Sequence, residues 1–222
     1  MKDAAASINF AADMQALVTS DMAAQTVSEI LEADPNTLNW EIGEAFAECI
    51  LAESDDATWP WHEGRDLKTP KASLPGADIV GFVGDNQDAC FLFGEVKTSS
   101  DISTPPGVLS GRSGLIHQVD TLANNARIKS CLVKYLYHRC VNTGFWPKYQ
   151  AAVKRYLASG GKDIMIVGVL LRDTPHNILD LQSRGMALAA SLNAPLRFRL
   201  DAWYLPRPCA EWPAILNATG AS

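Results

Sequence analysis

The chain has 222 residues, of which 47% are hydrophobic and 20% charged, and its formal net charge is −6. This length and composition predict one globular core with small additions rather than two independent domains. The five cysteines are widely spaced and form no CxxC pair, which argues against a disulfide framework and against a zinc knuckle. The N-terminus lacks the apolar run of a signal peptide, and no apolar run is long enough to cross a bilayer, so we expect a cytoplasmic protein.

Charge is distributed unevenly along the chain. Residues 1–66 hold 14 acids and 2 bases, a net charge of −12, whereas residues 108–162 hold 9 bases and 1 acid, a net charge of +8. The basic section can therefore present a phosphate-attracting surface although the whole chain is anionic. The alternative is that the acidic section packs on the basic section and neutralises it.

The N-terminal part of the chain is predicted to be helical. Apolar residues recur at near-helical spacing over residues 8–32, and Pro35 ends this pattern because proline disfavours helix in the residue before it. We therefore expect residues 1–36 to form an N-terminal helical extension and residues 37–222 to form the main domain.

A further amphipathic helix is predicted from Leu38 to Leu51. Glu41, Glu44 and Glu48 fall on a single stripe of this helix, so any one of them could face a site at the edge of the core. Taken singly, each is more often a solvated surface residue. Residues 53–75 then mix acids, prolines and tryptophans, which predicts an irregular connection.

Two β-type runs carry three charged residues where buried strands ordinarily carry none. The runs are Gly76–Phe82 and Phe91–Lys97, and the short polar turn between them predicts a hairpin. Residues two apart in a strand share a face, so Glu95 and Lys97 project together. Cross-strand pairing can bring the carboxylate of Asp78 beside that of Glu95. The hairpin thus predicts one cluster of three charges.

Asp78, Glu95 and Lys97 form a set that can hold a divalent cation beside a phosphate. Two adjacent carboxylates repel each other unless a cation lies between them, and oxygen ligands alone favour Mg²⁺ or Mn²⁺. A neighbouring lysine can orient or deprotonate a water molecule and stabilise charge that develops at the phosphoryl group. The alternative is a turn aspartate beside a surface ion pair, but charges within so apolar a hairpin are costly without a partner or a task.

The rest of the chain is predicted to alternate helices with two more strands. Residues 99–114 are rich in Ser, Gly and Pro, which favours a mobile loop that is either a gate beside the site or a plain linker. The order of elements predicts an α/β fold with a mixed β-sheet flanked by helices. We expect helices over residues 115–140, 146–158 and 177–192, strands over residues 163–171 and 196–205, and an irregular tail after Pro206.

The arrangement from Trp40 to Arg172 resembles the PD-(D/E)xK nuclease superfamily. The resemblance is carried by the aspartate on one strand, the Glu-x-Lys on the next, the preceding helix with its glutamates and the helix that follows. It implies a restriction-endonuclease-like fold, a Mg²⁺ or Mn²⁺ cofactor and hydrolysis of phosphodiester bonds.

The resemblance also implies a role for individual residues. Asp78 and Glu95 would be metal ligands and Lys97 the catalytic lysine. Glu44 would add a metal contact from the first helix, with Glu41 and Glu48 as rivals. Gln118, on the helix after the Glu-x-Lys strand, would be a polar helper.

Within the superfamily, the segments GADIVGF and FGEVKTSSD followed by a basic helical section are similar to the nuclease subunit of Hachiman-type antiphage defence, the HamA/AbpA-like group. This similarity implies DNA as substrate and a helicase as protein partner. We expect DNA phosphates to be drawn in by basic residues, namely Arg112, Arg127, Lys129 and Lys134.

Two other functions remain open on the sequence. One is an interaction subunit with a nuclease-like core that is catalytically silent or controlled by a partner, in which the acidic N-terminal section covers a basic cleft or docks a basic partner. The other is a phosphate-ester hydrolase acting on small nucleotides, which the long spread of basic residues disfavours.

Overall fold

The computed structural model describes residues 15–16, 18–20, 22–25, 39–60 and 76–219. The chain divides into two units, Met1–Asn36 and Thr37–Ser222, and the elements below belong to the second. The helices predicted over residues 8–32 lie largely outside the described residues.

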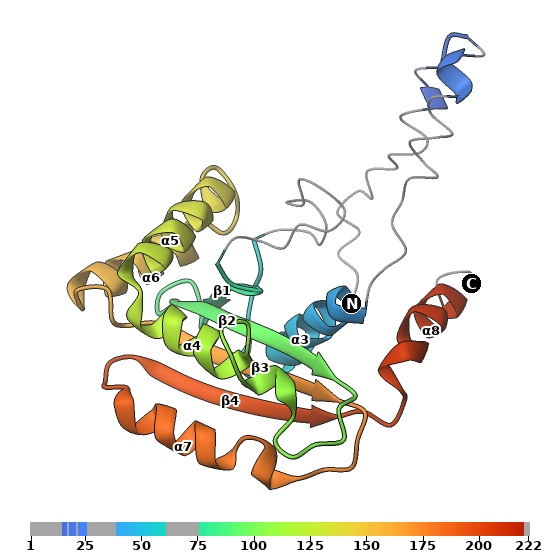
Figure 1. The fold of residues 1–222 in the computed structure, drawn as a ribbon. Helices are drawn as coiled ribbons and strands as arrows, with labels where there is room; N and C mark the ends of the chain where they lie inside the picture. The colour runs from blue at the N-terminus through green and yellow to red at the C-terminus, as the bar shows by residue number, and fades with distance from the viewer. Residues whose placement is uncertain (1–14, 17, 21, 26–38, 61–75, 220–222) are drawn as a thin grey trace. The chain divides into compact units, whose positions relative to one another are not determined.

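A four-stranded mixed sheet in the order β1-β2-β3-β4 forms the centre of the second unit (Figure 1). β1 (Ile79–Val83) runs antiparallel to β2 (Cys90–Ser99), and β2, β3 (Met165–Arg172) and β4 (Arg197–Tyr204) are parallel. The predicted hairpin and the predicted α/β fold with a mixed sheet are confirmed. β3 is buried along almost its whole length, as its unbroken apolar sequence predicts for a central parallel strand.

Helices cover both faces of the sheet (Figure 1). Side chains of β2 alternate between two apolar cores, with Leu92 and Val96 on one side and Phe91 and Phe93 on the other. The first core is closed by α3 (Asn39–Asp55) and α8 (Trp212–Thr219). The second is closed by α4 (Leu115–Asn124), α5 (Ala126–Cys140), α6 (Trp146–Ala158) and α7 (Gln182–Ser191).

Several helix boundaries differ from the sequence expectation. The predicted helix over residues 115–140 is divided at Asn125, whose side chain accepts hydrogen bonds from the main-chain N–H groups of Arg127 and Ile128 and so caps α5. The predicted irregular tail was wrong, because α8 follows a short 3₁₀ turn and buries Trp212 against the α3 side of the sheet. The other 3₁₀ turns are Gly107–Leu109 and Ile178–Asp180, the latter preceding α7.

The loop after β2 is fastened to the end of β3, whereas the sequence favoured a mobile loop. Asp101 stabilises the loop internally, since its carboxylate accepts hydrogen bonds from the N–H groups of Ser103 at 2.8 Å and Gly107 at 2.9 Å. The carbonyl of Asp101 accepts a hydrogen bond from Arg172, which is buried and also pairs with Asp180. This loop therefore leads from the charged end of β2 to α4 along a defined path.

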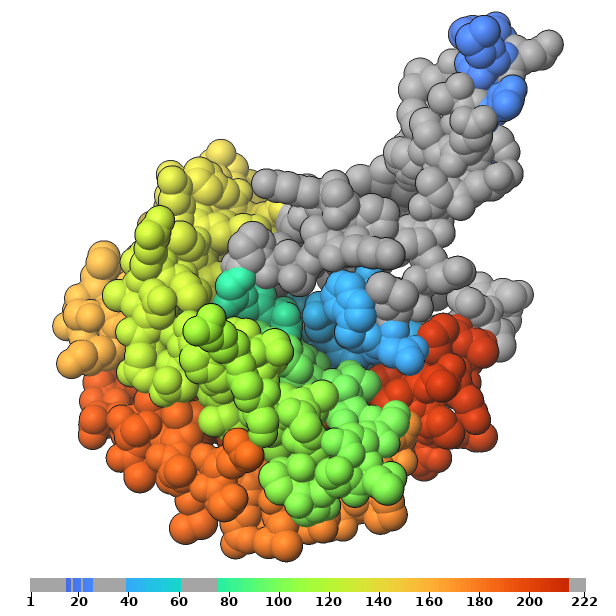
Figure 2. All heavy atoms as spheres, viewed as in Figure 1, coloured from blue at the N-terminus to red at the C-terminus, as the bar shows by residue number. Residues whose placement is uncertain are grey.

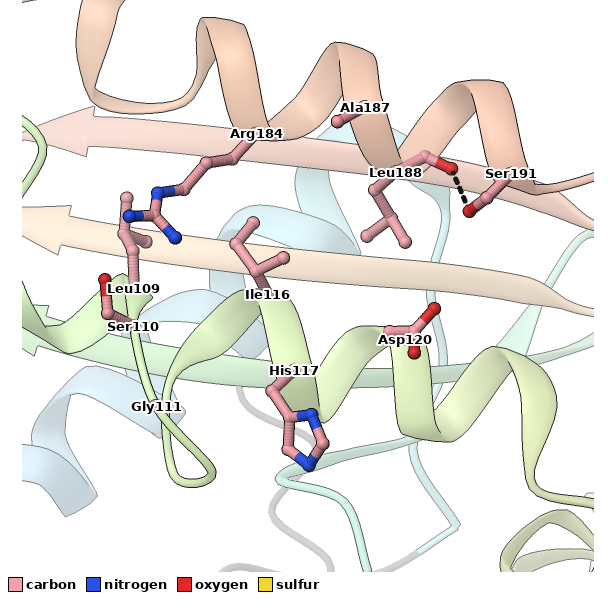
Figure 3. A pocket seen from close by; sticks show the side chains of 10 residues that line it. All are labelled: Leu109, Ser110, Gly111, Ile116, His117, Asp120, Arg184, Ala187, Leu188 and Ser191. Atoms are coloured by element: carbon pink, nitrogen blue, oxygen red, sulfur yellow. Dashed lines mark hydrogen bonds between the residues drawn. The ribbon is translucent and has the colours of Figure 1, made fainter.

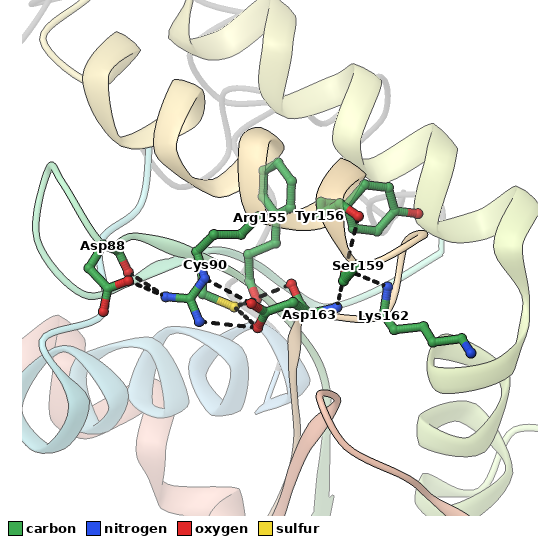
Figure 4. Close-up of polar contacts among 8 residues, drawn as sticks. Asp88, Cys90, Arg155, Tyr156, Ser159, Lys162 and Asp163 are labelled. Carbon is green, nitrogen blue, oxygen red and sulfur yellow. Dashed lines mark hydrogen bonds and ion pairs between the residues drawn. The ribbon is translucent and has the colours of Figure 1, made fainter.

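A polar network holds α6 against the hairpin turn and the start of β3 (Figure 4). Arg155 pairs with Asp88 in the turn at 2.5 Å and with Asp163 at 2.9 Å. Ser159 accepts a hydrogen bond from the N–H of Asp163 at 2.8 Å, and Gly161 has a positive φ of 81°, which allows the tight C-terminal turn of α6 predicted from the sequence. The network anchors the end of the hairpin that lies away from its charged residues.

The five cysteines are free thiols, and three of them, Cys90, Cys140 and Cys209, are buried. Among the residues that the structure describes, no helix is both long enough and apolar enough to cross a membrane.

Candidate functional site

Asp78 lies directly before β1 and extends its pairing with β2. Its main-chain N–H donates a hydrogen bond to the carbonyl of Gly94 at 3.0 Å, and its Oδ2 accepts one from the N–H of Val96 at 2.9 Å. Because Ile79 pairs with Gly94, the same antiparallel register sets Asp78 opposite Glu95. The two side chains lie on the same face of the sheet, as the period of two predicts, and their carboxyl groups share a hydrogen bond.

Lys97 completes the group on β2. Its Nζ lies 2.5 Å from Oε1 of Glu95, two residues away on the same strand face. The side chain of Glu95 is only 9% exposed and that of Lys97 is 24% exposed, so the ion pair has one buried and one accessible end. Val96, between them, points into the opposite core. The three residues singled out by the sequence are thus brought together.

The two carboxyl groups of the hairpin hold their protons more tightly than usual. Burial, the largest cause, and the negative charge of Asp78 together raise the pKa of Glu95 to about 7, against the lowering effect of Lys97. Burial also raises the pKa of Asp78, against the lowering effect of the Val96 N–H. For both groups burial is the largest cause, because removal from water disfavours the ionised carboxylate.

Glu44 reaches this cluster from α3. Burial, the largest cause, and the negative charges of Asp78 and Glu95 together raise its pKa to about 8. Among the three glutamates that the sequence left open, Glu44 is therefore shown to lie within electrostatic reach of both hairpin carboxylates. The negative charge of Glu48, one turn later, contributes to raising the pKa values of Glu44 and of Tyr135 on α5.

Gln118 lies in the first turns of α4, on the same side of the sheet as Glu95. Its Nε2 donates a hydrogen bond to the carbonyl of Arg112 at 2.9 Å, so its amide is engaged in the loop before the helix. Ile116 and Asp120 line a pocket shared with α7, and at about 100° per residue Gln118 points away from these two residues.

The predicted phosphate-binding bases have two different environments. Arg112, Arg127 and Lys134 are exposed. Lys129, in contrast, is buried, and its Nζ donates hydrogen bonds to the carbonyls of Ala123 at 2.9 Å and Gly161 at 3.3 Å.

Lys129 therefore ties α5 to the ends of α4 and α6, which departs from the role expected for it, and burial lowers its pKa. The signal was present in the sequence. Lys129 is three residues before Leu132 and seven before Leu136, on the apolar stripe of α5. A lysine on such an apolar stripe is a candidate for hydrogen bonding within the core rather than for binding phosphate.

The donor set of the cluster is suited to a hard divalent cation. Glu44, Asp78 and Glu95 supply only carboxylate oxygens, the ligands that Mg²⁺ and Mn²⁺ prefer. Within the described ranges, however, no group of three or more His, Cys, Asp or Glu side chains is arranged as a ready-made metal centre. A cation bound here would compete with protons for the carboxyl groups whose pKa values are raised.

A separate pocket of about 460 Å³ lies between α4 and α7 (Figure 3). The space-filling view shows these two segments side by side (Figure 2). The apolar side chains of Ile116 and Leu188 form part of its wall, together with His117, Asp120 and Arg184. None of Glu44, Asp78, Glu95 or Lys97 lines it, so the pocket is distinct from the carboxylate cluster.

Comparisons of the chain with protein families, with curated proteins and with solved structures found no match.

Proposed function

We propose that this protein is a metal-dependent nuclease of the PD-(D/E)xK type, with a restriction-endonuclease-like core, that hydrolyses phosphodiester bonds of DNA. The observation that carries the proposal is the opposition of Asp78 and Glu95 across two paired strands, with Lys97 bonded to Glu95. Glu44 adds a third carboxyl group from a separate element.

The charge balance of the cluster favours this function over a structural ion pair. A structural network usually pairs each buried carboxylate with a base. Here three acids, Glu44, Asp78 and Glu95, interact with one another. Among the described residues, Lys97 is the base whose charge lowers the pKa values of all three. Such an excess of carboxylates raises their pKa values and is typical of sites that bind a cation or transfer protons.

Each residue of the cluster then has a distinct task. Asp78 and Glu95, with Glu44, would hold Mg²⁺ or Mn²⁺. The cation would supply charge stabilisation at the phosphoryl group and favour attack by water. The accessible ammonium group of Lys97 lies on the same strand face, where it can orient a water molecule or donate a hydrogen bond to a phosphate oxygen. Gln118 would add a polar contact from α4.

DNA as substrate is supported by the exposed bases that follow the cluster in the chain. Arg112 precedes α4, and Arg127 and Lys134 project from α5, within the section whose net charge is +8. Neutralising phosphates with such residues supplies most of the affinity of non-specific DNA binding. A helicase partner and a role in antiphage defence are further parts of the proposal, and they depend on the sequence similarity to Hachiman-type nuclease subunits.

The test is cleavage of plasmid DNA, single-stranded DNA and RNA by the full chain in the presence of Mg²⁺ or Mn²⁺. Wild type should cleave DNA, Glu95→Gln should not, and Lys97→Ala should cleave it far more slowly. Glu53→Gln is the matched control, because Glu53 is an exposed glutamate of the same helix as Glu44. Equal cleavage by wild type and both site variants would contradict the proposal, and preferential cleavage of RNA would replace DNA as its substrate.

A further inference from the structure

Helix α3 approaches β2 unusually closely at Gly43. A Cβ atom added to Gly43 would lie 2.3 Å from Oγ1 of Thr98 and 3.4 Å from Cδ1 of Leu171. Cβ atoms in proteins essentially never come within 3.0 Å of such a neighbour. An alanine therefore fits at this position only if the Thr98 side chain changes its rotamer or α3 moves away from β2.

The hydroxyl group of Thr98 has no evident stabilising role. Its Oγ1 is buried and lacks a hydrogen-bond partner, one of four such side-chain atoms among the described residues. A buried hydroxyl without a partner is unfavourable, and a glycine inside a helix is less favourable than alanine. Judged by helix propensity and hydrogen bonding alone, Gly43 and Thr98 are each less favourable for stability than alanine, so their presence indicates a role other than stabilisation.

The position of this contact within the cluster suggests the reason. Gly43 is followed by Glu44 on α3, and Thr98 is preceded by Lys97 on β2. The contact therefore lies one residue from two members of the cluster. Glu44, carried by the same helix, interacts electrostatically with Asp78 and Glu95 of the β1–β2 hairpin.

We propose that Gly43 and Thr98 are positioning residues, whose close contact brings Glu44 to Asp78 and Glu95 and so completes the cation-binding set. This inference rests on the proposed function, since it concerns the same site. Neither residue touches the cation or the substrate. An alanine at position 43 moves α3 away from β2 and withdraws Glu44.

The experiment compares Gly43→Ala, Thr98→Ala and the double variant. Gly43→Ala should weaken Mn²⁺ binding, measured by calorimetry, by about tenfold or more, the range found when residues that orient metal ligands are changed. It should also lower the melting temperature in EDTA. The double variant should recover both properties, because without Oγ1 the nearest atom of residue 98 is its Cβ, at 3.7 Å from the added methyl group.

Gly185→Ala on α7 is the matched control. A Cβ atom there would meet only Cδ1 of Leu200 within 4 Å, at 3.4 Å, which is an ordinary contact. This variant should bind Mn²⁺ like wild type and melt at the same or a higher temperature.

A Glu44→Gln background separates positioning from general damage. If Gly43 acts through Glu44, Gly43→Ala should cause no further loss of Mn²⁺ affinity in that background, whereas a general distortion would still weaken binding.

If wild type binds Mn²⁺ and Gly43→Ala binds it equally well, the positioning inference is overturned while the proposed function stands. A wild type that does not bind Mn²⁺ overturns the proposed function, and the inference with it. If Gly43→Ala in EDTA melts at or above the temperature of wild type, the added methyl group does not clash with Thr98, and the inference is overturned whatever the metal result.

Discussion

Lys97 and Glu95 form an ion pair of 2.5 Å on one face of β2, inside a cluster that contains two further carboxyl groups. Within the part of the chain that the structure describes, Lys97 is thus the base that offsets the charge of these three acids. A divalent cation would take over that role and leave the ammonium group of Lys97 available to water or phosphate.

Replacement of Lys97 by alanine should therefore separate catalysis from metal binding. We expect the rate of DNA cleavage to fall by about 10²–10³-fold, the range for loss of one group that stabilises transition-state charge. Mn²⁺ affinity should be retained, because Lys97 is not a ligand and its loss removes a competing cation from Glu95. The measurements are cleavage kinetics and calorimetric Mn²⁺ titration, and a loss of Mn²⁺ binding without a loss of rate at saturating metal would contradict these roles.

Stability without metal should fall as pH rises. The folded pKa values of Glu44, about 8, and Glu95, about 7, both lie above the ordinary value of 4.5. The folded state therefore binds more protons than the unfolded state between these values. The stabilisation is fully present below about pH 4.5 and is lost as pH rises through about 7 and 8. Melting temperatures measured in EDTA across this window should decrease.

Metal should reverse this trend, since Mg²⁺ or Mn²⁺ replaces the protons that the carboxyl groups lose. The stabilisation by Mn²⁺ should grow between about pH 5 and pH 8. Glu44→Gln should flatten the pH dependence in EDTA, and Glu53→Gln should leave it like that of wild type. Stability that is independent of pH in this window would show that the cluster does not retain its protons.

Basic residues of α5 should differ in their effect on DNA binding. Arg127→Ala and Lys134→Ala should each weaken binding to all sequences and reduce the slope of log affinity against log salt by about 1. Lys129→Ala should leave the slope unchanged and lower the free energy of unfolding by about 1–3 kcal/mol, because it leaves the carbonyls of Ala123 and Gly161 without their donor. Fluorescence anisotropy at several salt concentrations, with urea denaturation, measures both effects. An altered salt slope in Lys129→Ala would assign this lysine to the DNA surface after all.

The buried pair of Arg172 and Asp180 should be sensitive to loss of one partner. Both side chains are about 1% exposed or less, and Tyr204 also donates a hydrogen bond to Asp180 at 2.7 Å. Asp180→Asn should lower the free energy of unfolding by about 3–5 kcal/mol, because it leaves an uncompensated buried guanidinium group. The double variant Arg172→Met, Asp180→Leu should lose less than this. Urea denaturation measures both, and a double variant less stable than Asp180→Asn would contradict the electrostatic explanation.

The sequence was sufficient to predict the hairpin and the position of its charges. Alternation with a period of two is a local property, so it set Glu95 and Lys97 on one face and Val96 on the other before any tertiary contact was known. The mixed α/β sheet also followed from the order of elements, because each helix and strand carries its own periodic pattern.

Local patterns were not sufficient where two elements meet. The stripe of Glu41, Glu44 and Glu48 is continuous on the helix, and the height and rotation of α3 above β2 bring Glu44 within reach of the hairpin carboxylates. Lys129 was expected on the surface, and the packing of three helix ends buried it instead. The restriction-endonuclease-like fold stays a prediction.

By itself the sequence determined which charged residues share one face of the hairpin, since residue type and strand period are properties of neighbouring positions. The tertiary structure alone decided which carboxylate joins Asp78 and Glu95 from another element. That outcome depends on a contact between residues 55 positions apart, Gly43 and Thr98, whose closeness is set by the packing of a helix on a sheet. No periodicity along the chain encodes such a distance.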